Sequence, residues 1–298
     1  MSTTTDPAAT AAHASLPAAT RLGTVHLTVR DLERSVDFYR EAIGLAELRR
    51  EDRTAWVGAG DRAMLALHED PSAADPGRTA GLYHVALNTL DRLELARLTR
   101  RLAETRTPIQ GASDHGTHEA IYLPDPDGNG LELAADRERE VWPDLTKVEE
   151  IRPRPLDLDA LLQLTAGESL VELTAPGARV GHLHLHLGDL DRGLAFHRDL
   201  LGFDLQTLIP GQAAFVSAGG YHHHLAFNLW KGAGVPPQPE GRVGLRHWTV
   251  VVPTADDVAE VCGRLVAAGA PTSDVEGGFR AQDPGALAVH VVAEGGDR

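Results

Sequence analysis

The fold is decided by the stretch Gly23-Thr-Val-His26-Leu-Thr-Val-Arg-Asp31-Leu-Glu-Arg34, in which a short alternating strand runs into a helix start. It returns 158 residues later (His26 to His184) as Gly181-His-Leu-His184-Leu-His-Leu-Gly-Asp189-Leu-Asp-Arg192. Between residues 23–45 and 181–203, nine positions are identical. A repeat of this length indicates duplicated domains, because solenoid repeats have periods of about 20–50 residues.

Each half also starts a second time, with Gly81-Leu-Tyr-His84-Val-Ala-Leu in the first half and Gly244-Leu-Arg-His247-Trp-Thr-Val in the second. Each start is followed by one amphipathic helix and two or three strands. The sequence therefore predicts an α+β fold of four tandem βαβββ modules. The predicted helices span 32–42 and 190–201, capped by Asp31 and Asp189, and the predicted strands span 54–59, 64–68, 213–217 and 222–229.

The predicted organisation has four parts. Residues 1–20 are expected to form a disordered tail, since they are rich in Ala and Thr and lack the basic start and apolar run of a signal peptide. Residues 21–136 form a catalytic, metal-binding domain, and residues 180–298 a degenerate copy. Residues 137–179 form a structured linker, with a helix near 156–164, that packs across both halves.

Composition excludes several classes of function. The 298 residues carry a formal net charge of -15, which argues against nucleic acid and anionic membranes as partners. No stretch approaches the roughly 18 apolar residues of a membrane span. The single cysteine, Cys262, excludes an intrachain disulfide and a thiolate metal cluster, and fits a reducing, cytoplasmic location.

Three side chains are candidates for a metal site. His26 and His84 occupy matching places in the first strands of two modules, and Glu132 lies on the last strand of the second module. If these two modules pair about a pseudo-twofold axis, the three side chains converge. Two imidazoles and one carboxylate suit Fe(II), Mn(II), Ni(II) or Zn(II) and form the ligand set of non-heme Fe(II) oxygenases. The turn Asp125-Pro-Asp-Gly-Asn129-Gly, which precedes Glu132, is interpreted as structural.

The chain resembles the vicinal oxygen chelate superfamily, which includes glyoxalase I, bleomycin-resistance proteins and extradiol ring-cleaving dioxygenases. The paired modules cover residues 21–294. The more specific resemblance is the spacing of His115, Ile121-Tyr122, Asp125-Pro126, Gly128 and Glu132, which looks like the extradiol dioxygenase signature. The runs Gly-Gly-Tyr221-His-His-His224 and Asp136-Arg-Glu-Arg-Glu-Val-Trp-Pro143 look like bacterial two-domain catechol 2,3-dioxygenase-like proteins.

The resemblance implies that Fe(II), or alternatively Mn(II), binds to His26, His84 and Glu132 and that a small aromatic diol is cleaved with O2 beside its hydroxyls. His115 is then the acid–base group and Tyr122 a hydrogen-bond donor to substrate. The second half offers His184, His247 and His290 as a second, weaker metal site. There Ser273 and Arg280 replace His115 and Tyr122, which is why this half is interpreted as degenerate.

The resemblance leaves one gap. Extradiol enzymes carry a further acid–base histidine near the end of the first module of the catalytic domain, and here the comparable histidines, His222–His224, lie in the other half. They serve a second site, reach across the domain interface, or are structural. Two other functions stay open: another metal enzyme of this fold, such as a glyoxalase-like isomerase or thiol transferase, and a metal-free binding or resistance protein. A homodimer is also open.

Overall fold

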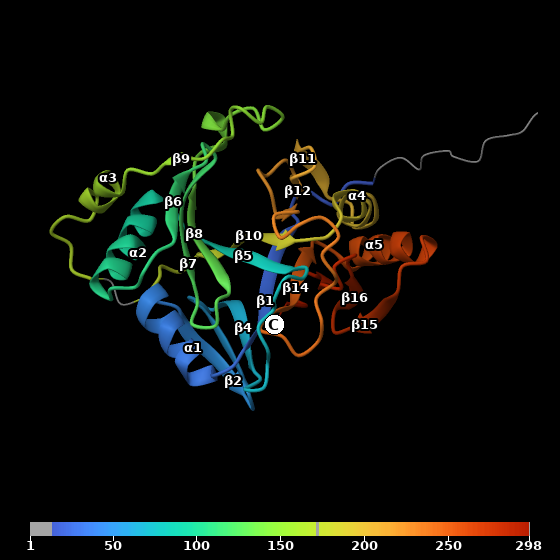
Figure 1. The fold of residues 1–298 in the computed structure, drawn as a ribbon, viewed down its shortest axis with the longest axis horizontal. Helices are drawn as coiled ribbons and strands as arrows, with labels where there is room; N and C mark the ends of the chain where they lie inside the picture. Colours follow the sequence, from blue (N-terminus) through green and yellow to red (C-terminus); the bar gives the residue numbers. More distant parts are fainter. Residues whose placement is uncertain (1–13, 171–172, 298) are drawn as a thin grey trace, which may run out of the picture.

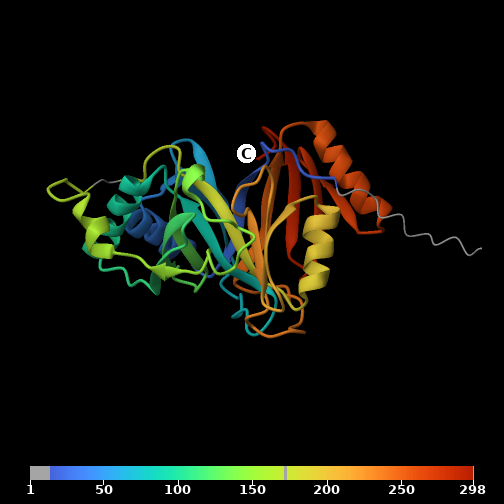
Figure 2. The same ribbon diagram turned by 90° about the horizontal axis from the view of Figure 1, so that it is seen from above.

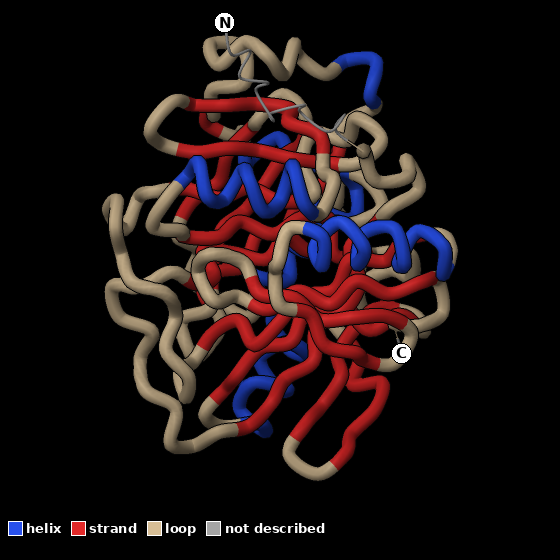
Figure 3. The backbone as a smooth tube through the Cα atoms, turned by 90° about the vertical axis from the view of Figure 1, so that its right-hand side faces the viewer, coloured by secondary structure: helices blue, strands red, loops and turns tan. Residues whose placement is uncertain are grey.

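The computed structural model describes residues 14–170 and 173–297. Figure 1 shows two lobes, one from each half of the sequence, and Figure 2 shows the same two lobes from above. Strands dominate the regular structure, and helices lie across them (Figure 3). None of the helices formed by the described residues combines the length and the apolar composition that a membrane span requires. The α+β prediction is confirmed.

Two β-sheets each extend across both lobes. The first has eight strands, in the spatial order β15 (Thr272–Val275), β16 (Gly278–Gln282), β17 (Ala288–Ala293), β14 (Gly244–Val252), β1 (Arg21–Val29), β4 (Arg62–Glu69), β3 (Thr54–Ala59) and β2 (Ala46–Glu51). The second has nine, in the order β11 (Asp204–Ile209), β12 (Ala213–Ser217), β13 (Leu225–Asn228), β10 (Arg179–His186), β5 (Gly81–Asn88), β8 (Gly130–Asp136), β7 (His118–Pro124), β6 (Gly111–Asp114) and β9 (Arg154–Pro155).

Each module contributes a helix after its first strand. The helices are α1 (Leu32–Phe38), α2 (Arg92–Glu104), α4 (Leu190–Leu194) and α5 (Ala255–Ala267), and α3 (Leu158–Gln163) lies in the connection between the halves. All four module helices have side-chain caps, from Asp31, Asp91, Asp189 and Thr254. The four predicted βαβββ modules are therefore confirmed.

The modules do not pair within each half. β1 of the first module pairs antiparallel with β14 of the fourth, and β5 of the second pairs antiparallel with β10 of the third. The condition on which His26 and His84 were expected to converge, pairing of the first module with the second, is therefore not met. Each sheet takes one module from each half, so both halves are needed to complete either sheet.

Within each half, the two modules are joined by a repeated contact. Helix α1 continues into a π-helical turn, η1 (Tyr39–Ile43), and the Tyr39 hydroxyl donates to Asp125 at 3.1 Å. In the second half, η3 (Ala195–Leu200) follows α4, and His197 Nε2 lies 3.3 Å from Asp283. Each acid is buried in the turn before the last strand of the following module. Each turn therefore holds the two modules of its half together, which agrees with the structural role expected for the turn at Asp125.

The structure confirms some of the predicted strand bounds and corrects others. Strands 54–59 and 213–217 are confirmed, but β13 begins only at Leu225, so His222–His224 lie in a loop. Residues 1–13 of the predicted disordered tail lie outside the described residues. Residues 14–20 are ordered: the Leu16 side chain is buried, and its N–H donates to Gly202 O at 2.7 Å. This apolar anchor is why the tail prediction is wrong there.

We expect Asp125→Ala to lower the free energy of unfolding by about 3 kcal/mol, since buried donors left without an acceptor cost about 1–3 kcal/mol each. Asp125 accepts from the N–H groups of Asp127 and Asn129, from the Asn129 amide and from Tyr39. Asp274→Ala, on the exposed edge strand β15, serves as the control and should change stability by less than about 0.5 kcal/mol. Urea unfolding measures both, and equal effects would contradict the structural role.

Candidate metal centre and active site

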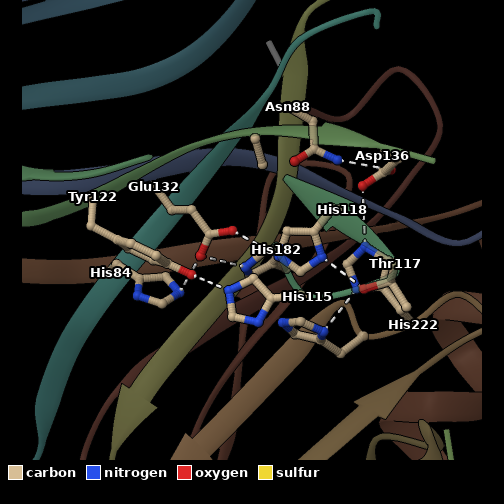
Figure 4. Close-up of polar contacts among 12 residues, drawn as sticks. His84, Asn88, His115, Thr117, His118, Tyr122, Glu132, Asp136, His182 and His222 are labelled. Carbon is tan, nitrogen blue, oxygen red and sulfur yellow. Dashed lines mark hydrogen bonds and ion pairs between the residues drawn. The ribbon is translucent and has the colours of Figure 1, made fainter. Parts of the chain in front are cut away.

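The centre of the nine-stranded sheet brings together His84, Glu132 and His182 (Figure 4). Ala86 of β5 faces Glu132 of β8 on one side and His182 of β10 on the other. His84 lies two residues from Ala86 and so shares its face of the strand. The small Ala86 side chain leaves room between the larger groups.

The distances within this group are short. Glu132 Oε2 lies 3.0 Å from His84 Nε2 and 3.3 Å from His182 Nε2, and Glu132 Oε1 lies 3.0 Å from His118 Nε2. Glu132 and His182 are each 1% exposed. One ligand atom from each of His84, Glu132 and His182 lies within 4.8 Å of the others, as does one from each of His182, His222 and His223.

The charge state of this group suits a metal. Burial alone would raise the pKa of Glu132, but the approach of His182, His118 and His84 holds that pKa well below its usual value. Burial lowers the pKa of His182. The group therefore combines an ionised carboxylate with a neutral imidazole, and these are the forms that coordinate divalent ions.

Unsatisfied polar atoms test whether a metal fits. His84 Nε2 and Glu132 Oε1 are fully buried, and neither makes a hydrogen bond of acceptable geometry with a described residue. Such atoms are uncommon in folded proteins, and they often mark a position where an ion or a water molecule binds. Two imidazoles and one carboxylate therefore fit a divalent transition metal.

His115 and Tyr122 form a pair beside this group. His115 Nε2 lies 2.7 Å from the Tyr122 hydroxyl, and its ring stacks on His118 with centroids 4.6 Å apart. Tyr122 also faces Glu132 across the β7–β8 ladder. Burial lowers the pKa of His115 to about 4, so that its imidazole is neutral near pH 7. The predicted site residues His84, His115, Tyr122 and Glu132 thus lie together.

The second half of the sequence contributes further polar side chains next to this pair. The His222 ring stacks on His118 at 4.7 Å, and its Nε2 lies 3.1 Å from Asp136 Oδ1. Tyr221 also donates to Asp136, at 2.8 Å. Although burial would raise it, the pKa of Asp136 is held below its usual value by His222 and Tyr221. Of the three alternatives for His222–His224, the structure favours the reach across the interface.

A cavity of about 440 Å³ is lined by these polar side chains: His84, His115, His118, Tyr122, Glu132, His182 and His222. Its wall also contains apolar side chains of the connection between the halves (Leu145, Val148, Ile151, Pro153) and of the second half (Ile209, Phe215, Trp230). The connection is held against the second half by a hydrogen bond that the Thr207 hydroxyl donates to Leu145 O. Residues 145–153 therefore cover the metal group, the name used from here on for His84, Glu132 and His182.

The structure corrects the place of His26. It lies on β1 in the eight-stranded sheet, where its Nδ1 is 2.8 Å from His68 Nε2 and its ring stacks on His247. The third position of the group is taken by His182, because the second module pairs with the third. The candidate site was assigned to residues 21–136 alone, but it draws on both halves.

The predicted second set of His184, His247 and His290 is also divided between the sheets. His247 and His290 stack in the eight-stranded sheet, at 3.9 Å. His184 belongs to β10, lines the cavity, and lies 2.8 Å from the Asn228 amide. The three residues cannot form one site, again because of the exchanged module pairing.

His182 and His118 were missed by sequence reasoning. The sequence signal that could have identified His182 is its distance from the helix cap. His84 lies seven residues before Asp91, and His182 lies seven residues before Asp189. The alignment on the repeated Gly-x-x-His selected His184 instead. In the first module the same count reaches Thr24, which cannot replace an imidazole. His118, next to the loop that carries His115, had no comparable signal.

Comparisons with known proteins agree with this fold. Residues 21–133 and 179–285 match the Glyoxalase/Bleomycin resistance protein/Dioxygenase superfamily. The Catechol-2,3-dioxygenase of Bacillus subtilis (strain 168) is 42% identical over 270 residues, which cover 89% of this chain and 94% of that protein. The Lactoylglutathione lyase of Neisseria meningitidis serogroup A is 32% identical over 118 residues, 36% of this chain and 84% of that protein.

Among solved structures, glyoxalase I from Zea mays superposes with a TM-score of 0.60 at 17% identity, covering 92% of each chain. This likeness concerns the fold alone. The chain belongs to the Glyoxalase/Bleomycin resistance protein/Dioxygenase superfamily, the vicinal oxygen chelate proteins, as the sequence resemblance implied. It shares the greater part of its length with a relative named as a catechol dioxygenase.

Exchange of single histidines tests which residues bind the metal. We expect His182→Ala to weaken divalent metal binding at least about 100-fold, since loss of even an outer partner of a metal ligand costs about 10–100-fold. His26→Ala, a matched change in the other sheet, should leave affinity unchanged. Equilibrium dialysis with Mn(II) measures both, with circular dichroism to check folding. Loss in His26→Ala but not in His182→Ala would contradict the structural assignment.

Proposed function

We propose that the protein is an Fe(II)-dependent extradiol dioxygenase that cleaves a catechol-type ring with O2. The observation that carries the proposal is the buried set of His84, His182 and Glu132 that lines a cavity of about 440 Å³. Two imidazoles and one carboxylate leave positions open for substrate and O2. The 42% identity to a Catechol-2,3-dioxygenase supports it, and Mn(II) is the alternative metal.

The proposed reaction breaks one ring carbon–carbon bond beside the diol. Both atoms of O2 enter the product, one in a carboxylate and one in an aldehyde or ketone, so no external reductant is needed. When bound, the metal would hold both diol oxygens and align them with O2.

The chain itself supplies proton transfer. A diol must lose protons to bind as a catecholate, and the neutral imidazole of His115 can accept one. Tyr122 holds His115 Nε2 through its hydroxyl and keeps the ring directed at the cavity. His222, held by Asp136, provides a second imidazole that lines the cavity and, like His115, stacks on His118. These two histidines can then serve removal and return of a proton at different substrate atoms.

The alternatives fit the cavity less well. A glyoxalase-like isomerase or a thiol transferase is expected to use more than one carboxylate ligand, whereas Glu132 is the one acidic residue among the described residues that line this cavity. A metal-free binding protein has no need of a buried carboxylate between imidazoles, since such a group is costly without a partner. Both alternatives predict no consumption of O2.

The decisive experiment offers catechol to anaerobically Fe(II)-loaded protein and then admits 18O2. We expect O2 uptake, a yellow ring-opened product, and two 18O atoms per product molecule by mass spectrometry. Glu132→Gln keeps the shape of the side chain but removes the charge, and it should abolish uptake by weakening the metal site. Full metal occupancy with no uptake over a panel of catechols would overturn the proposal.

A second prediction concerns the proton-transfer pair. His115→Asn should lower kcat about 100-fold or more, which is the usual scale for loss of a general acid or base. Tyr122→Phe keeps the ring but loses the hydroxyl that holds His115, and should reduce kcat by a smaller factor. His68→Asn, in the other sheet, is the matched control. A fall in metal content rather than in kcat would contradict the assigned roles.

The apolar cavity wall leads to a prediction about substrates. Each buried methylene contributes about 0.8 kcal/mol, or about fourfold in binding. We therefore expect kcat/KM to rise along a series of catechols with methyl, ethyl and propyl substituents. Ile151→Ala should flatten this rise, whereas Leu164→Ala, at an exposed position outside the cavity, should not. A constant or falling kcat/KM along the series in the unaltered protein would contradict contact between this wall and the substituent.

A further inference from the structure

His184 of β10 is a buried imidazole in the wall of the cavity, and the proposed chemistry does not use it. Its backbone pairs with that of His84 on β5, and the two rings meet edge to face with centroids 5.1 Å apart. The rings of Tyr83, Phe215 and Trp230, which also line the cavity, lie 5.1, 5.9 and 5.1 Å from it. His184 therefore lies in an aromatic part of the cavity, directly beside a candidate metal ligand.

The amide of Asn228 decides which ring nitrogen of His184 carries a hydrogen. The backbone N–H of Trp230 donates to Asn228 Oδ1 at 3.0 Å, and because a backbone N–H can only donate, this atom must be the amide oxygen. Asn228 Nδ2 then lies 2.8 Å from His184 Nε2, and an amide nitrogen can also only donate. His184 Nε2 is therefore the acceptor, and the ring hydrogen lies on Nδ1.

The Nδ1–H group of His184 is open to the cavity. It makes no hydrogen bond with a residue of the described ranges 14–170 and 173–297, and protein atoms do not enclose it fully. Burial holds the pKa of His184 well below its usual value, so the ring is neutral near pH 7. Neither nitrogen is free to bind a metal, since Nε2 accepts from Asn228 and Nδ1 carries the hydrogen. His184 thus presents a fixed hydrogen-bond donor to whatever occupies the cavity.

This donor is separate from the proton-transfer pair of His115 and Tyr122. In the order of strands, β10 with His184 lies on one side of β5, and β8 and β7 with Tyr122 lie on the other. The His84 ring contacts both neighbours, Tyr122 at 5.6 Å and His184 at 5.1 Å between centroids. A ring whose two hydroxyls bind at the metal group near Tyr122 can therefore extend a substituent toward His184.

We propose that His184 selects the substrate: its Nδ1–H donates a hydrogen bond to a substituent oxygen, so that the preferred diol ring bears a carbonyl group. The inference rests on the proposed function, because it requires a diol at the metal group. A site that holds a polar donor in a fixed direction discriminates against ligands that leave the donor unpaired. Asn228 is then a positioning residue, which acts on the substrate only through the hydrogen that it keeps on His184 Nδ1.

Two diols of nearly equal shape test the assignment: 4-acetylcatechol, which has a carbonyl oxygen, and 4-isopropylcatechol, which has none. Calorimetry measures their dissociation constants with anaerobic Mn(II)-loaded protein, and the pair substituted at ring position 3 is measured alongside. His184→Phe keeps an aromatic ring but removes the donor. At one of the two ring positions, we expect it to weaken binding of the acetyl compound about fivefold relative to the isopropyl compound, the scale of one hydrogen bond.

The comparison removes two other effects. The influence of the acetyl group on the acidity of the diol is the same in both proteins, so it cancels in the ratio. His290→Phe, a matched change in the other sheet, is the control and should leave the ratio unchanged. Manganese content and circular dichroism are measured for each variant, because His184 lies two residues from His182.

A second measurement needs no folded variant and no diol. In 15N-histidine-labelled protein, NMR should show the hydrogen of His184 on Nδ1, and a hydrogen on Nε2 would overturn the proposal. An equal effect of His184→Phe on both diols at both ring positions would also overturn it, and would leave the proposed dioxygenase function intact. Failure of every diol to bind the Mn(II)-loaded protein would overturn the proposed function and this assignment together.

Discussion

The antiparallel pairing of β5 with β10 is the constraint on which the rest of the site depends. It joins strands that lie almost 100 residues apart (His84 to His182) and belong to different halves. Its register sets His182 beside Ala86, and the parallel pairing of β8 sets Glu132 on the other side of Ala86. A shift of one residue would turn His182 away into the core. The metal group, the His118–His222 stack and the cover formed by residues 145–153 all require this one register.

Local structure was readable from the sequence because its causes are local. Alternation along β1 and β10, the Asp31 and Asp189 caps, and the turn at Asp125 depend on residues within a few positions of one another. His84 and Glu132 were found for the same reason, since both belong to one module. Module pairing was not readable, because alternation tells which face of a strand is buried but not which strand lies beside it. Because the module pairing could not be predicted, His26 rather than His182 was expected to be the third metal ligand.

The two sheets show how one scaffold supports opposite electrostatics. Both have two first strands in antiparallel register at their centre, with an apolar core on one face. The backbone fixes where side chains point, so a few replacements decide what the face attracts. Tyr122 pairs with Glu132 in one sheet and Arg280 pairs with His290 in the other, so the first pair carries a negative charge and the second a positive one. The eight-stranded sheet therefore keeps the strand pairing of the other sheet but carries a different charge at these positions.

Because the candidate metal ligands come from both halves, metal binding and the joining of the halves would be linked. A ligand that binds only the folded arrangement stabilises it by an amount set by its concentration relative to its dissociation constant. His84 and Glu132 belong to the first half and His182 to the second, so an ion between them would act directly across the β5–β10 ladder. The same ladder without the ion leaves an ionised carboxylate beside the neutral imidazole of His182, with polar atoms unsatisfied. In the absence of metal, these polar groups destabilise the centre of the sheet. Bound metal would hold the two halves together through the same groups.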